Sequence, residues 1–139
     1  MTERRKNVVR YRIEQADDAV RAARMLLENG MPRQSVGRSY YAMFYGVLAL
    51  LAVEGQGTSK HSRALAMFDM EFIRGHKLPK QLSDWLHKAF ELRLQADYQE
   101  FTEVSRETAA EALEHAATFV SRVRDHLEGL MGPEEQPES

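Results

Sequence analysis

Apolar residues recur at helical spacing from the start of the chain. In the first segment they alternate in steps of four and three residues, which places them on one stripe of a helix. These residues are Val9, Ile13, Ala16, Val20, Ala23 and Leu27. Gly30 ends this helix, and Pro32 prevents its continuation. The pattern predicts a long amphipathic helix with one buried face.

The next segment carries two adjacent apolar rows, on a helix that starts near Arg33 or Ser35. The first row holds Val36, Tyr40, Met43, Val47 and Leu50, and the second holds Tyr41, Phe44, Leu48 and Leu51. A helix with two apolar rows is covered on more than one side. We therefore expect it to lie in the centre of a bundle or against a second subunit.

Three more helical segments follow a loop at residues 54–60, where Thr58 or Ser59 is placed to cap the next helix. The first is short and ends near Gly75, the second begins at Pro79, and the third begins at Thr102 or Ser105. Their inward rows are Leu65, Phe68 and Phe72, then Leu82, Leu86, Ala89 and Phe90, then Ala109, Leu113, Ala116, Val120, Val123, Leu127 and Leu130. No segment shows the alternation of a strand. The sequence predicts an all-α fold, an antiparallel four-helix bundle with one additional short helix.

The length of 139 residues fits a single domain. We expect a helical domain at residues 1–130 and a disordered, acidic tail at residues 131–139. The amino terminus lacks the apolar core of a signal peptide, and the longest apolar stretch, residues 40–53, is shorter than the ~20 residues of a membrane span. With no cysteine in the chain, these features predict a cytoplasmic protein that does not enter a membrane.

Charge is distributed unevenly along the chain. Residues 1–63 carry a net charge of +5 and residues 64–139 a net charge of −7, which together give the −2 of the whole protein. Helices of a bundle bring distant segments together, so the charges of the two halves can still mix in space. The asymmetry therefore permits a basic face for nucleic acid without establishing one.

Arg93 is the first candidate for a functional residue, because the inward row of its helix takes its next step of four onto this arginine. A guanidinium on an apolar stripe needs a partner. Asp97 lies four residues later, within helical reach, and Tyr98 follows it. One interpretation is a structural Arg–Asp pair with Tyr98 in the core. The other is a cleft in which Arg93 binds a phosphate and Tyr98 supplies a hydroxyl.

Lys60 and His61 form a second candidate site at the start of the short helix, where free N–H groups and the helix dipole favour an anion. A histidine there can also transfer protons near neutral pH, although a solvated first turn is the simpler interpretation. In the preceding helix, Tyr40 or Tyr41 can place a hydroxyl in a cleft, and we select Tyr41 as a binding residue. Aromatic residues at this spacing also serve as core or interface residues.

Metal binding has little support in the sequence. Asp84 and His87, or Glu111 and His115, are spaced to chelate an ion, but a di-iron bundle needs Glu-x-x-His motifs that this chain lacks. A scattered triad of His76, His87 and His115 remains an alternative. We predict no metal site and no cofactor.

Three motifs taken together resemble the HEPN superfamily. They are Ser39-Tyr-Tyr-Ala-Met-Phe-Tyr45, Ser59-Lys-His61 and Arg93-Leu-Gln-Ala-Asp-Tyr98. Their order and spacing are most similar to the small stand-alone HEPN proteins encoded beside a minimal nucleotidyltransferase, over about residues 8–130. The resemblance implies a helical homodimer with a cleft between its subunits that binds RNA or a nucleotide, and a nucleotidyltransferase as partner in a pair similar to a toxin–antitoxin system.

The resemblance also implies a possible reaction. Many HEPN proteins are metal-independent endoribonucleases that use an arginine followed after four to six residues by a histidine. Here the positions after Arg93 hold Tyr98, Gln99 and Glu100, so that histidine is missing. We therefore favour a binding protein, in which Lys60, Arg93, Asp97 and Tyr41 contact RNA or nucleotide. The endoribonuclease alternative would use Arg93, Tyr98 and His61, provided that the fold brings His61 near Arg93.

Overall fold

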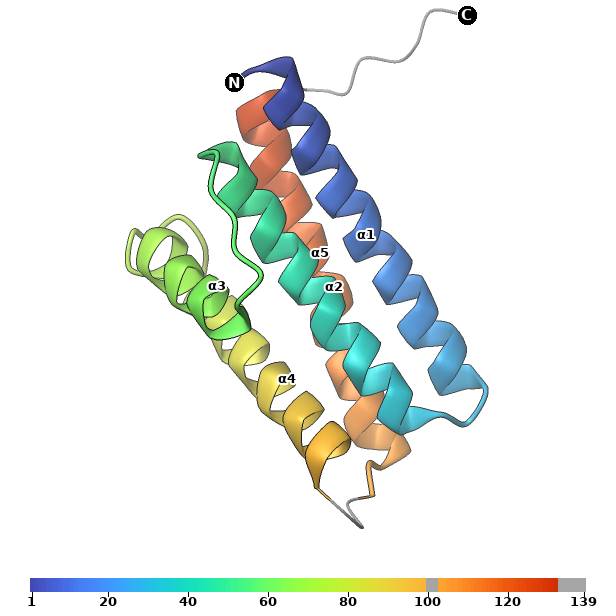
Figure 1. Ribbon diagram of the computed structural model, residues 1–139. Helices are drawn as coiled ribbons and strands as arrows, with labels where there is room; N and C mark the ends of the chain where they lie inside the picture. Colours follow the sequence, from blue (N-terminus) through green and yellow to red (C-terminus); the bar gives the residue numbers. More distant parts are fainter. Residues whose placement is uncertain (100–102, 133–139) are drawn as a thin grey trace, which may run out of the picture.

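The computed structural model, described here for residues 1–99 and 103–132, is a bundle of long helices with a shorter helical segment on one side (Figure 1). The long helices are α1 (Glu3–Glu28), α2 (Pro32–Val53), α4 (Lys80–Tyr98) and α5 (Arg106–Met131). The shorter segment consists of α3 (His61–Phe68) and a π-helical turn, η1 (Asp69–Ile73). In Figure 1, α1 runs antiparallel to α2, and α4 runs antiparallel to α5. The all-α bundle predicted from the sequence is confirmed.

The helix ends follow from local sequence signals. Thr2 caps α1 by accepting a hydrogen bond from the Arg5 backbone N–H at 3.2 Å, and Ser105 caps α5 by accepting one from the Thr108 N–H at 3.0 Å. Pro32 is the first residue of α2. This position suits proline, because the backbone N–H that proline lacks would have no partner within the first turn of the helix. The last helix continues through Met131, one residue past the predicted boundary, and residues 133–139 of the predicted tail lie outside the described residues.

The predicted cap of the short helix is wrong. The N-cap of α3 is Lys60 and its side chain makes no capping bond. Thr58 instead accepts a hydrogen bond from the Lys60 backbone N–H at 3.1 Å, so its hydroxyl stabilises the loop before the helix. The correction places His61 as the first residue of α3.

The second helix lies at the centre of the protein. It contacts α1, α5, α4 and α3, and both of its apolar rows are buried within one chain except at Tyr41, which is partly buried. The rows therefore do not require a second subunit. Among the described residues, α2 is the one helix long and apolar enough to span a membrane by length and composition. It is longer than the apolar stretch noted in the sequence, and 72% of its apolar window is buried in the bundle, as is usual for a core helix.

The π-helical turn was not predicted from the sequence. After Phe68 the hydrogen bonding widens, and the Arg74 backbone N–H donates to the Asp69 carbonyl at 2.9 Å. The Asp69 carboxylate binds two side chains of α4, with 2.6 Å to the Ser83 hydroxyl and 2.6 Å to Nε2 of His87. These bonds fasten the α3–η1 segment to α4.

Candidate functional site

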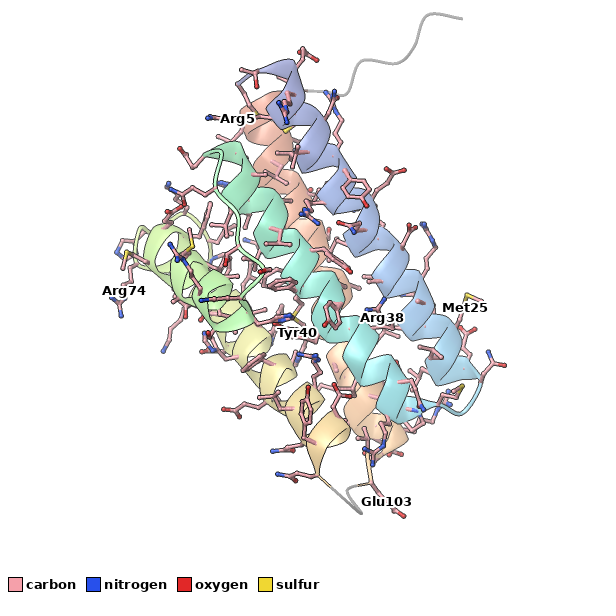
Figure 2. All side chains as sticks on the ribbon, in the orientation of Figure 1. Arg5, Met25, Arg38, Tyr40, Arg74 and Glu103 are labelled. Carbon is pink, nitrogen blue, oxygen red and sulfur yellow. The ribbon has the colours of Figure 1, made fainter. Side chains whose placement is uncertain are left out.

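A buried tyrosine and the first residue of α3 meet in the middle of the protein. Tyr40 of α2 is fully buried, and its hydroxyl lies 2.7 Å from Nδ1 of His61. The His61 ring stacks on Phe44, one turn further along α2, with ring centroids 4.2 Å apart and planes 6° apart. Figure 2 labels Tyr40 on α2, where the loop from the upper end of that helix returns to the start of α3. The loop at residues 54–60 thus positions the histidine.

The electrostatics of this pair favour one proton arrangement. Burial raises the pKa of the Tyr40 phenol far above its usual range, so the hydroxyl keeps its proton and donates it to His61. Burial, and then the positive charge of Arg93, lower the pKa of His61, so the neutral ring is favoured at pH 7. In the tautomer in which Nδ1 accepts this hydrogen bond, the proton of the neutral ring lies on Nε2, and His61 presents that N–H as a donor.

Arg93 of α4 also lies against Tyr40. Its side chain is only 16% exposed, and its guanidinium carbon lies 5.5 Å from the centre of the Tyr40 ring and 5.1 Å from that of Tyr41. Both contacts have the distance of a cation–π interaction. Nε of Arg93 lies 3.3 Å from Oδ2 of Asp97, so the predicted reach of four residues is confirmed. Across residues 1–99 and 103–132, the terminal nitrogens of this guanidinium have no hydrogen-bond partner.

Arg93 forms part of a groove between α2 and α4, which we call the α2–α4 groove. It has a volume of about 690 Å³ and is lined by Leu26, Arg33, Gln34, Gly37, Arg38, Tyr41, Arg93, Ala96 and Asp97. Arg38 lies over Tyr41, with its guanidinium carbon 4.9 Å from the ring centre. Arg33 donates a hydrogen bond to the Ala96 carbonyl and so holds α2 against α4. The groove therefore combines aromatic surface with arginines from both helices.

The residues predicted from the sequence fall into two groups. Arg93, Asp97 and Tyr41 line the α2–α4 groove, and the ring of His61 lies 5.6 Å from that of Tyr41. Lys60 is exposed on the loop side of His61. Tyr98 is 74% exposed at the end of α4, which excludes the interpretation that it packs in the core. Five residues along a helix turn it about 140° away from Arg93, and it does not line the groove.

Sequence reasoning assigned no role to Arg38 or Gly37 and preferred Tyr41 to Tyr40. The structure shows that Tyr40 carries the hydroxyl that reaches a histidine, whereas Tyr41 contributes its ring to two guanidinium groups. One signal was available for Arg38. It lies three residues before Tyr41, on the same face of a helix, so the two side chains were placed to meet.

The structure does not assemble the alternative metal triad. His87 binds Asp69, whereas His115 of α5 stacks on Trp85 with ring centroids 4.5 Å apart. His76 follows η1 and adopts a positive φ of 56°. In the part of the chain that the structure describes, no three His, Cys, Asp or Glu side chains are arranged to hold a metal ion.

Comparison with known proteins gives a consistent set of matches. A family model described as the HEPN domain matches residues 9–126. A UPF0332 protein of Thermotoga maritima is 35% identical over 130 residues, which cover 94% of this chain and 98% of the relative. Two proteins of Methanocaldococcus jannaschii, named "Putative toxin MJ0142" and "Putative toxin MJ0605", are 33% and 32% identical. These matches cover 83% and 86% of this chain, and 78% and 88% of the respective relatives.

Proposed function

Because this chain belongs to the HEPN domain family, we propose that it is a toxin-like HEPN protein that binds RNA or a nucleotide in the α2–α4 groove. The names of the two Methanocaldococcus relatives support the toxin-like part of the proposal. The observation that carries the binding part is the state of Arg93. Its guanidinium is held on two tyrosine rings, and its terminal nitrogens have no hydrogen-bond partner among the described residues.

The geometry suits a phosphate better than it suits a purely structural role. Asp97 approaches Arg93 only through Nε, so the contact orients the guanidinium without occupying its terminal nitrogens. Those nitrogens form the part of an arginine that binds phosphate oxygens in pairs. Arg38 adds a second positive charge on the same groove.

Binding through phosphate contacts predicts a definite dependence on salt. Each phosphate neutralised on a single strand contributes about −0.7 to the slope of log K against log salt concentration, so contacts from Arg38 and Arg93 predict a slope of about −1.4. The test is titration of the purified protein into a fluorescein-labelled single-stranded ten-nucleotide RNA at several salt concentrations. Saturable binding with that slope supports the proposal. Absence of binding at micromolar protein, or a slope near zero, contradicts it.

Metal-independent RNA cleavage is the second candidate, favoured by the position of His61 beside Tyr40 and Arg93. In this reaction the ribose 2′-hydroxyl loses its proton to a base and attacks the adjacent phosphorus. The 5′-oxygen leaves and takes a proton from an acid, giving a 2′,3′-cyclic phosphate and a 5′-hydroxyl, while Arg93 stabilises the charge at phosphorus. The acid step needs a protonated imidazolium, which the lowered pKa of His61 disfavours, and among the described residues no histidine lines the α2–α4 groove to act as base. We therefore rank cleavage below binding.

An assay in EDTA separates the two candidates. The labelled RNA is incubated with the protein, and the products are resolved by size and end chemistry. Cleavage that yields cyclic phosphate ends and is lost in His61→Gln supports the endoribonuclease. Intact RNA under conditions of saturated binding supports the binding protein.

The partners are part of the same proposal. We expect a homodimer and a complex with a small nucleotidyltransferase, as the family resemblance implies. Because both apolar rows of α2 are covered within one chain except at Tyr41, they do not by themselves mark the dimer surface. Light scattering at micromolar concentration tests the dimer. Co-purification with a nucleotidyltransferase encoded beside the gene tests the pair.

A further inference from the structure

Gly37 of α2 has no structural reason to be glycine. It is the sixth residue of a helix of 22 residues and has no positive φ. A Cβ atom added to it would meet nothing within 4 Å beyond its chain neighbours and its own helix backbone. Glycine inside a helix is less favourable than alanine, because it loses more backbone freedom on folding. The folded chain would thus be more stable with alanine at this position.

The other glycine within α2, Gly46, is explained by close packing against α5. A Cβ atom on Gly46 would lie 3.3 Å from the ring of Phe119, so the glycine allows α5 to pack closely against α2. Gly37 faces no such neighbour and lines the α2–α4 groove with Arg38 and Arg93. The empty space above Gly37 therefore belongs to the groove. This suggests that a molecule outside the chain approaches the helix backbone there.

We propose that the sugar–phosphate backbone of a bound RNA strand lies directly against the backbone of α2 at Gly37, between Arg38 and Arg93. This inference rests on the proposed function and adds a steric requirement to it: a side chain at position 37 excludes the strand. An RNA strand fits the groove better than an apolar segment of another protein would. Such a segment would cover the half-buried guanidinium of Arg93 without pairing it, and an uncompensated buried charge is costly.

The chain offers a matched control in Gly129 of α5. This glycine is also helical, also has nothing within 4 Å of an added Cβ, and is exposed outside the α2–α4 groove. We expect Gly37→Ala and Gly129→Ala each to raise the melting temperature by about 2–6 °C, because alanine favours the helix. An increase in both variants shows that neither position depends on glycine for folding.

Binding of the labelled ten-nucleotide RNA distinguishes the two positions. Gly37→Ala should weaken binding about threefold and Gly37→Leu about tenfold or more, because the larger side chain occupies the space of the strand. Gly129→Ala and Gly129→Leu should bind as the unchanged protein does. If Gly37→Leu folds and binds RNA with unchanged affinity, the inference is wrong, although the proposed function stands as long as the unchanged protein binds RNA. If the unchanged protein does not bind RNA, the proposed function itself is wrong, and the inference about Gly37 is wrong with it.

One further measurement separates RNA from a protein occupant. Light scattering of Gly37→Leu and of the unchanged protein at the same concentration reports whether position 37 lies in an interface between copies. An unchanged mass together with weaker RNA binding supports the inference. A lower mass with unchanged RNA binding would assign the space above Gly37 to a second copy of the chain and overturn it.

Discussion

Arg93 and Arg124 are both partly buried arginines that face an aspartate, but they are held in different ways. Arg124 of α5 donates to Asp17 of α1, so its terminal nitrogen joins two helices. Arg93 contacts Asp97 of its own helix through Nε, and its charge lies on the rings of Tyr40 and Tyr41. The side chain of Arg93 is also less exposed, at 16% against 36% for Arg124.

The difference shows which arginine is placed for stability. A pair between two helices restrains the bundle, whereas a pair within one helix is worth only about 0.3–0.5 kcal/mol. A purely structural arginine can often be replaced by an apolar residue without loss. The cation–π contacts of Arg93 also join α4 to α2, but they leave its terminal nitrogens without a hydrogen-bond partner among the described residues. The comparison therefore favours a role in the fold for Arg124 and supports the ligand-binding role that we propose for Arg93.

The largest expected effect comes from exchanging each arginine for methionine, which keeps much of the side-chain volume. Arg93→Met should weaken binding of the labelled RNA by about 1.5–3 kcal/mol, or about 10- to 100-fold, because it removes charge-assisted hydrogen bonds. Its melting temperature should barely change. Arg124→Met should bind RNA normally and lose about 0.5–1 kcal/mol of stability in urea unfolding. An Arg93→Met protein that unfolds, or that binds RNA normally while folded, would make Arg93 a structural partner of Asp97.

The next effect concerns the hydroxyl of Tyr40. Tyr40→Phe keeps the ring below Arg93 but removes the hydrogen bond to His61, so we expect the free energy of unfolding to fall by about 1 kcal/mol. Tyr45→Phe is the matched control on the same helix, since the structure gives its hydroxyl no hydrogen bond among the described residues. Urea unfolding of both variants measures the difference. Equal losses in the two variants would show that the contact with His61 adds no stability.

A smaller effect is expected in the pH dependence of stability. Burial and Arg93 lower the pKa of His61 in the folded protein, so a proton binds more readily to the unfolded chain. The stabilising contribution of the neutral ring is complete above the unfolded pKa of about 6.5 and is lost as the pH falls below it. Urea unfolding at pH 7.5, 6.5 and 5.5 should show a shallower decline for His61→Gln than for the unchanged protein. Parallel declines would mean that His61 takes up protons equally in both states.

Much of the fold could be predicted because amphipathic stripes and helix-ending residues act locally. The stripe from Val9 to Leu27 and the stop at Gly30 and Pro32 are read directly from spacing, and the structure places α1 and the start of α2 accordingly. The choice of Arg93 as a candidate site residue also follows from local sequence, since it interrupts an apolar row. Its contact with Asp97 needs only a continuous helix.

The rest of the site depends on contacts between distant segments. Tyr40 and His61 meet because of the path of the loop at residues 54–60, which its composition does not specify. The π-helical turn at Asp69 depends on bonds to α4 that no spacing reveals. The sequence shows a glycine at position 37, but only the packed structure shows that the space above it is empty.

The smallest effect on folding and binding is expected at Tyr98. This residue bears on the comparison of Arg93 with Arg124, because it lies in the last turns of α4 beside Asp97, the partner of Arg93. Its side chain is 74% exposed and lies outside the α2–α4 groove. Tyr98→Phe should therefore change stability by less than about 0.5 kcal/mol and leave RNA affinity unchanged, as should Tyr11→Phe on α1, whose residue is 57% exposed. Under the proposed pairing with a nucleotidyltransferase, the exposed phenol of Tyr98 is a candidate to attack the α-phosphorus of ATP and release pyrophosphate. We expect mass spectrometry after incubation with that partner and ATP to show an added nucleotide in Tyr11→Phe but not in Tyr98→Phe. If both variants are modified, Tyr98 is not the residue that accepts the nucleotide. Arg93 and His61 then remain the candidate site residues.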